Sequence, residues 1–138
     1  MLTVSFVTFI AFIALVAAIM IFAPRPKLDP RAHHSQVPSS DPATLSRWLQ
    51  DYEAGIPHIT AGAEATIAWA DGETVQDYCF LYIHGFSATR RETAPLTERI
   101  ANEFGGNVIY ARLAGHGLEQ HAMEAPAEEW LRSTQISW

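Results

Sequence analysis

The hydrophobic and polar positions divide the chain into three parts. Residues 2–23 carry no charged side chain and only three hydroxyl side chains. Residues 24–41 are rich in proline and serine and show no apolar periodicity. From residue 42 onward, short apolar runs alternate with polar segments. We therefore expect a transmembrane anchor at 1–23, a linker at 24–41 and a folded domain at 42–138.

The first apolar run is predicted to be an uncleaved, single-pass membrane anchor. A helix over 2–23 would rise roughly 33 Å, enough to cross a hydrocarbon core. No Lys or Arg precedes it, and it is longer than the ~7–15 apolar residues of a signal peptide. Arg25, Lys27 and Arg31 follow it, so the positive-inside rule favours a cytoplasmic domain. Three charges leave the side of the membrane open.

Alternating apolar patterns predict helices and strands in the remaining chain. Helices are expected after the capping residue Asp41, near Thr93 and after Pro126. The second of these carries apolar residues at helical spacing, Leu96, Ile100 and Phe104. Strands are expected at 65–70, 78–83 and 107–111, and the continuous apolar run at 78–83 is typical of a strand covered on both faces.

The order of these elements predicts an α/β fold. The strands at 78–83 and 107–111, with the helix between them, form a βαβ unit and should be parallel neighbours. We expect a mostly parallel sheet with helices on both faces. Ligands of such sheets bind at the carboxyl ends of the strands, which here are the loops that begin at His84 and Arg112.

Composition removes several classes of function. Nine basic and fifteen acidic residues give a net charge of −6, so no basic surface is available for nucleic acid. Cys79 is the only cysteine, which excludes an internal disulfide, and its place in an apolar strand predicts a buried, inert thiol. The spacing of His116 and His121 does not align two ligands on a helix, so no metal or cofactor is expected.

The loop after the 78–83 strand raises a mechanistic question. Its sequence Gly85-Phe86-Ser87-Ala88 is close to a nucleophile elbow, Gly-x-Ser-x-Gly, without the last glycine. Ser87 could therefore be an attacking residue or a loop hydroxyl. No serine of the chain lies between two glycines at that spacing.

Two motifs together resemble the N-terminal part of an α/β-hydrolase. His84-Gly85-Phe86-Ser87 follows one predicted strand, and Gly115-His116-Gly117 follows the next. The pair is similar to that of lipases and carboxylesterases, including monoacylglycerol-lipase-like proteins. The resemblance implies that the backbone N–H of Phe86 is an oxyanion-hole donor. It also implies that the other residues of both loops, Ser87 among them, shape the site.

The same resemblance implies a function for the full-length protein. The protein would be a membrane-anchored hydrolase of carboxylic esters, lipid or acylglycerol-like, with a Ser-Asp/Glu-His triad located beyond residue 138. The 138-residue chain alone would then be an inactive, truncated portion. The alternative is a catalytically inert, hydrolase-like module that binds a ligand. The acyl and alcohol groups, any lid and the oligomeric state have no signal in these residues.

Overall fold

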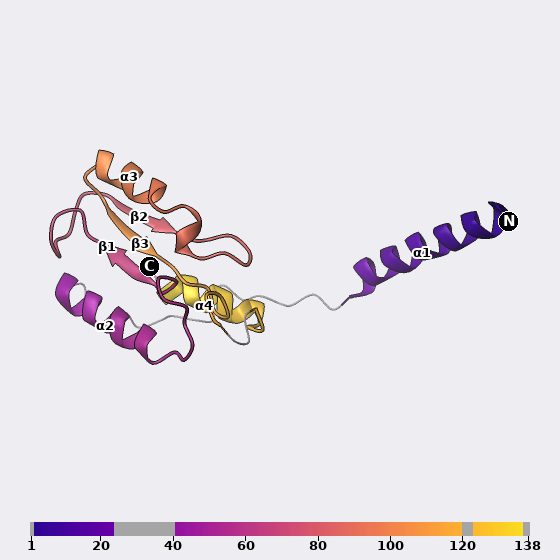
Figure 1. The fold of residues 1–138 in the computed structure, drawn as a ribbon, viewed down its shortest axis with the longest axis horizontal. Helices are drawn as coiled ribbons and strands as arrows, with labels where there is room; N and C mark the ends of the chain where they lie inside the picture. Colours follow the sequence, from indigo (N-terminus) through magenta and orange to yellow (C-terminus); the bar gives the residue numbers. More distant parts are fainter. Residues whose placement is uncertain (1, 24–40, 120–122, 137–138) are drawn as a thin grey trace.

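A computed structural model describes residues 2–23, 41–119 and 123–136, although side chains 2–5 and 136 are not described. The predicted linker, with the basic residues used for orientation, lies outside this part except for Asp41. Figure 1 shows α1 (Leu2–Phe22) apart from the other elements.

The prediction of a single-pass anchor at 1–23 is wrong. Within the described residues, no helix combines the length and the apolar character that crossing a membrane requires.

The first helix of the folded part is α2 (Pro42–Ala54), and it begins where the sequence predicts. The carboxylate of Asp41 accepts a hydrogen bond from the Thr44 N–H at 2.9 Å, and Gly55 forms the C-cap. Its buried face is unusual, because it carries two polar residues, Ser46 and Glu53, beside the apolar Leu49. Polar groups buried in this way need hydrogen-bond partners from the rest of the fold.

Three short strands form a mixed sheet, not the mostly parallel sheet predicted. They are β1 (Thr66–Ala68), β2 (Cys79–Tyr82) and β3 (Asn107–Tyr110), in the order β1-β3-β2. β2 pairs with β3 in parallel, as the βαβ unit predicts, whereas β1 pairs with β3 antiparallel. The antiparallel pair is what contradicts a hydrolase-type parallel sheet among the described residues.

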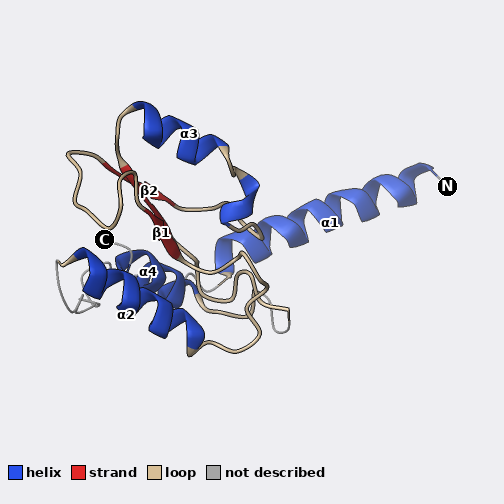
Figure 2. Ribbon diagram, turned by 60° about the vertical axis from the view of Figure 1, so that its left-hand side comes forward, coloured by secondary structure: helices blue, strands red, loops and turns tan. Residues whose placement is uncertain are grey.

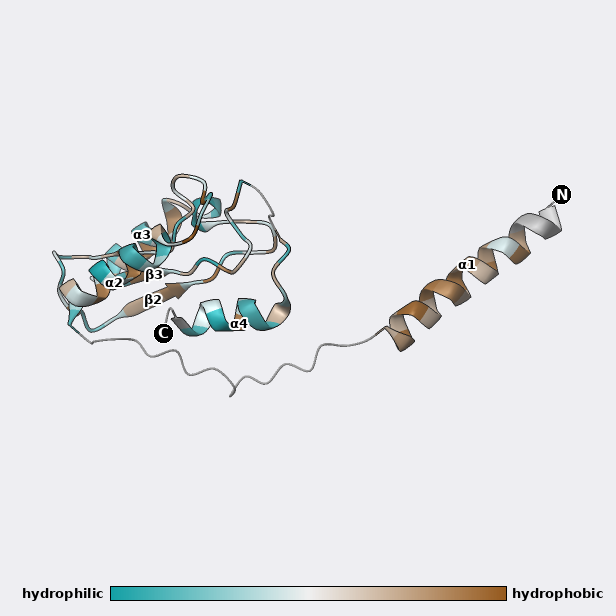
Figure 3. Cartoon of the chain, turned by 90° about the horizontal axis from the view of Figure 1, so that it is seen from below, coloured by the Kyte–Doolittle hydropathy of each residue, from teal (hydrophilic) through white to brown (hydrophobic). Residues whose placement is uncertain are grey.

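Helices lie on both sides of this sheet. α3 (Leu96–Glu103) lies on one side, and α2 and α4 (Ala127–Ile136) lie on the other in Figures 1 and 2. A short 3-10 helix, Arg90–Glu92, precedes α3. Figure 3 shows hydrophobic residues along β2 and hydrophilic residues over much of α4.

The core is built around β3, the central strand. Val108, Tyr110 and Ala101 of α3 are fully buried, and Phe80 and Tyr82 of β2 pack against them. The expectation that the 78–83 strand is covered on both faces is wrong, because Tyr78, Cys79 and Ile83 are exposed. The apolar spacing in α3 does not mark its buried face either, since Leu96, Ile100 and Phe104 are 45–58% exposed.

Candidate active site at the ends of β2 and β3

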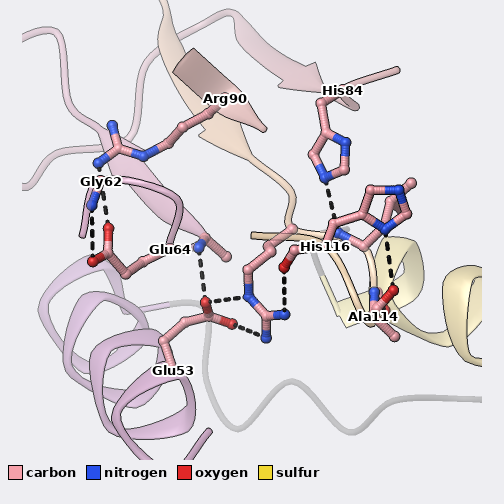
Figure 4. A network of polar contacts seen from close by, with 11 residues as sticks. Glu53, Gly62, Glu64, His84, Arg90, Ala114 and His116 are labelled. Carbon is pink, nitrogen blue, oxygen red and sulfur yellow. Dashed lines mark hydrogen bonds and ion pairs between the residues drawn. The ribbon is translucent and has the colours of Figure 1, made fainter. Parts of the chain in front are cut away.

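Two loops meet at the carboxyl ends of the parallel strands. The register pairs Tyr82, the last residue of β2, with Tyr110, the last residue of β3. The loop that begins at Ile83 and the loop that begins at Ala111 therefore leave the sheet at the same edge. His84 joins them, because its Nε2 accepts a hydrogen bond from the Leu113 N–H at 3.1 Å (Figure 4).

His84 uses both ring nitrogens for this structural role. Its Nδ1 lies 3.0 Å from the Gly85 carbonyl oxygen, which can only accept, so Nδ1 carries the proton. Nε2 is then the bare nitrogen that the Leu113 N–H requires. The side chain is buried, and this desolvation lowers the pKa of His84, which keeps the ring neutral. No nitrogen of His84 is left to act as a general base on a substrate.

The predicted oxyanion loop is a β-turn. The Ala88 N–H donates to the Gly85 carbonyl at 3.1 Å, which places Phe86 and Ser87 at the two central positions. The Gly85 N–H donates to the Glu92 carboxylate at 3.2 Å. Within the described part of the chain, the N–H groups of Phe86 and Ser87 donate to no acceptor. The turn thus presents two unused backbone donors at the end of β2.

Ser87 is an exposed residue of this turn, with a φ of 60°. The segment after it continues through two loop residues to the 3-10 helix, whereas a nucleophile elbow enters a helix directly. No hydrogen bond connects its hydroxyl to a histidine among the described residues. Within the described residues, the geometry therefore gives Ser87 no hydrogen-bonded histidine that could activate it.

The second loop, Gly115-His116-Gly117, has a backbone that requires its glycines. Gly115 and Gly117 have φ values of 72° and 67°, in the left-handed region that L side chains rarely adopt. A Cβ on Gly117 would also lie 2.7 Å from the Ala63 Cβ. Between them His116 is 1% exposed, and its ring centroid lies 4.8 Å from that of His84. The predicted loop-shaping residues of both motifs therefore meet in space.

An aromatic wall from α4 completes the site, and the sequence did not indicate it. The Trp130 ring centroid lies 5.3 Å from His116 and 6.1 Å from Phe86. Ser133, one turn further along α4, accepts a hydrogen bond from the Ala114 N–H at 2.9 Å. This bond ties α4 to the second loop. In the sequence, Trp130 and Ser133 lie three residues apart on a predicted helix, so they share one face. This spacing does not indicate which part of the chain that face contacts.

A buried ion pair supports the second loop from below. Arg112 Nε lies 2.7 Å from Glu53 Oε2, and Arg112 Nη2 lies 3.1 Å from Oε1 (Figure 4). Both side chains are 5% exposed. The same carboxylate accepts the Ala65 N–H at 2.9 Å. The pair borders a cavity of about 240 Å³ whose lining also includes Leu49, Ile56, Leu118 and Ser133.

Comparisons of the chain with protein-family models, with curated proteins and with solved structures found no match. The function of the two loops therefore has to be inferred from their residues and geometry.

Proposed function

We propose that this chain carries the oxyanion-binding side of a serine ester hydrolase, whose Ser-Asp/Glu-His triad lies beyond residue 138. The observation that supports this most directly is the unused N–H of Phe86 at the carboxyl end of β2. In acyl transfer, a backbone donor at this place stabilises the negative charge that develops on the carbonyl oxygen. The paired His-Gly and Gly-His-Gly loops support the same assignment.

The surrounding residues fit an ester substrate with an apolar part. Phe86 is 76% exposed, and its ring and that of Trp130 form an apolar border beside the donor. Glu92 holds the Gly85 end of the turn, and the Tyr82 hydroxyl donates to the same carboxylate at 3.1 Å. His84 fixes the turn but offers no free nitrogen, which is why the proposal places the base elsewhere. A lipid or acylglycerol-like ester is the substrate class that this border favours.

Serine-reactive labelling tests the location of the nucleophile. The 138-residue chain and the same chain continued by its own gene are incubated with a fluorophosphonate probe and with a p-nitrophenyl ester. We expect no labelling or turnover in the shorter chain, and both in the longer one, with the label on a serine beyond residue 138. Labelling of Ser87 would overturn the assignment. A continuation without Gly-x-Ser-x-Gly, or one that is inert to both reagents, would favour the binding-module alternative.

Backbone substitution tests the role of Phe86 in the active, longer protein. Replacing the amide N–H of residue 86 by an ester oxygen deletes only the donor, and should lower kcat by about 10²–10³. Phe86→Leu keeps the donor and should change KM more than kcat. Ser87→Ala should leave most of the rate, because a loop hydroxyl contributes at most one hydrogen bond. If Ser87→Ala abolished activity while the ester backbone was tolerated, Ser87 would be the nucleophile.

A further inference from the structure

Two buried ring nitrogens of the site have no hydrogen-bond partner within the described residues. They are His116 Nε2 and Trp130 Nε1, and each exposes almost no surface. His116 Nδ1 lies 3.1 Å from the Ala114 carbonyl oxygen, so Nδ1 carries the proton and Nε2 is a bare acceptor. The indole Nε1 of tryptophan is a donor only. An unsatisfied acceptor and an unsatisfied donor thus belong to neighbouring rings.

Leaving both groups unsatisfied is unfavourable. A buried polar group without a partner destabilises a protein by about 1–3 kcal/mol, so such groups in native proteins call for a specific explanation. The two ring centroids lie 5.3 Å apart and the planes meet at 70°. A group that both donates and accepts would satisfy both nitrogens at once.

The Phe86 ring lies next to both rings, at the solvent-exposed end of the first loop. Its ring centroid lies 6.5 Å from His116 and 6.1 Å from Trp130, yet the residue is 76% exposed. Little buried apolar surface becomes exposed to water when a side chain that is already this exposed turns away. Phe86 also sits in a turn beside Ser87, whose φ of 60° is unfavourable for a non-glycine residue. The side chain is therefore suited to act as a movable cover.

We propose that His116 Nε2 and Trp130 Nε1 form a binding site for an alcohol hydroxyl, opened by displacement of the Phe86 side chain. The hydroxyl oxygen accepts from the indole N–H, and its proton is donated to the imidazole. A carboxylate would satisfy Trp130 but present lone pairs to the bare nitrogen of His116. An ammonium group would satisfy His116 but offer the indole no acceptor. The three surrounding rings select an apolar body next to the hydroxyl.

This inference rests on the proposed function in one respect only. If the chain belongs to an ester hydrolase, the bound hydroxyl is that of the alcohol half of the ester. Hydroxyl binding itself requires no turnover. Alcohol binding in a protein without esterase activity would therefore contradict the proposed function but support this site. Esterase activity without alcohol binding at these rings would support the proposed function but contradict this site.

Nuclear magnetic resonance of the full chain with 1-hexanol tests the site. The indole N–H signal of Trp130, assigned by through-bond experiments on the isotope-labelled wild-type chain, should move downfield, and the Nε2 signal of His116 should move with it. The Trp69 indole already donates to the Ser46 hydroxyl at 3.0 Å and serves as the internal reference. Pentyl methyl ether has the same shape but no proton to donate. It should bind about threefold to tenfold more weakly, the value of one hydrogen bond.

The remaining arms complete the test. Trp130→Phe keeps a ring but deletes the donor, and should weaken 1-hexanol binding by a similar factor at an unchanged Trp69 signal. Phe86→Ala should strengthen binding because no cover has to move.

Equal binding of ether and alcohol would overturn the proposal, as would shifts at other indoles only. A scalar coupling between Trp130 Nε1–H and His116 Nε2 in the ligand-free chain would also overturn it, because the rings would then satisfy each other. The ether comparison needs no variant, so it decides the matter even if a substitution prevents folding.

Discussion

At the scale of single residues, the second loop depends on a glycine with no room for a side chain. Gly117→Ala would place a methyl group 2.7 Å from the Ala63 Cβ at a φ of 67°. Backbone strain and overpacking together should lower the free energy of unfolding by about 2–4 kcal/mol. Gly72 is the matched control, because its φ is 55° and nothing lies within 4 Å of its added Cβ.

Gly72→Ala should therefore lower the free energy of unfolding by only about 1 kcal/mol. Urea denaturation of both variants followed by circular dichroism gives the two values. Equal losses would show that the contact between residues 63 and 117 does not constrain the loop.

The buried histidine of the first loop predicts a pH dependence of stability. Burial lowers the pKa of His84 below its ordinary value of 6.5 in the folded state, so the unfolded chain binds the extra proton first. Its contribution to stability is complete above pH 6.5 and decreases as the pH falls from there toward the folded-state pKa. The melting temperature should consequently decrease as the pH is lowered from 7.5 to 5.5.

The non-titrating variant His84→Gln isolates this effect. At pH 7.5 the variant should have a lower melting temperature than the wild type, because two loop hydrogen bonds are altered. Its melting temperature should also decrease less as the pH is lowered. The same acid sensitivity in both proteins would assign the effect to other groups.

At the scale of elements, α3 packs through its smallest apolar residue. Ala101 is 0% exposed against β3, whereas Ile100 is 45% exposed. Ala101→Leu should lower the free energy of unfolding by about 1–3 kcal/mol because it overfills this contact. Ile100→Ala should change it by less than about 1 kcal/mol, since much of that side chain already contacts solvent. Chemical denaturation of both variants gives the two values. A larger loss of free energy of unfolding for Ile100→Ala than for Ala101→Leu would contradict the observed packing.

At the scale of the whole molecule, one ion pair connects α2 to the site. Glu53 and Arg112 are 59 residues apart in sequence, and their side chains are 5% exposed. Arg112→Met leaves a buried carboxylate without its cation, which should lower the free energy of unfolding by about 3–5 kcal/mol. The double variant with Glu53→Leu should lose markedly less than the sum of the single variants. A double-mutant cycle measures this coupling, and strictly additive losses would contradict it.

Features that depend on neighbouring residues could be predicted from the sequence. Asp41 and Gly55 bound α2 because capping involves groups within one turn of the helix. The parallel pairing of β2 and β3 followed from the handedness of a βαβ crossover, which brought the His84 and His116 loops to one edge. The sequence therefore indicates the residues of both loops, although not their contacts with α2 and α4.

Features that depend on distant parts of the chain required the tertiary structure. An apolar strand such as 78–83 has the same pattern whether it lies at the centre or the edge of a sheet, so the central place of β3 was not predictable. The antiparallel pairing of β1 is likewise a matter of long-range contact. The partners Glu53 and Arg112, and Trp130 and His116, come from separate elements with no shared local pattern. Local patterns determine which residues form an element, but only packing decides which of its faces is buried and against what.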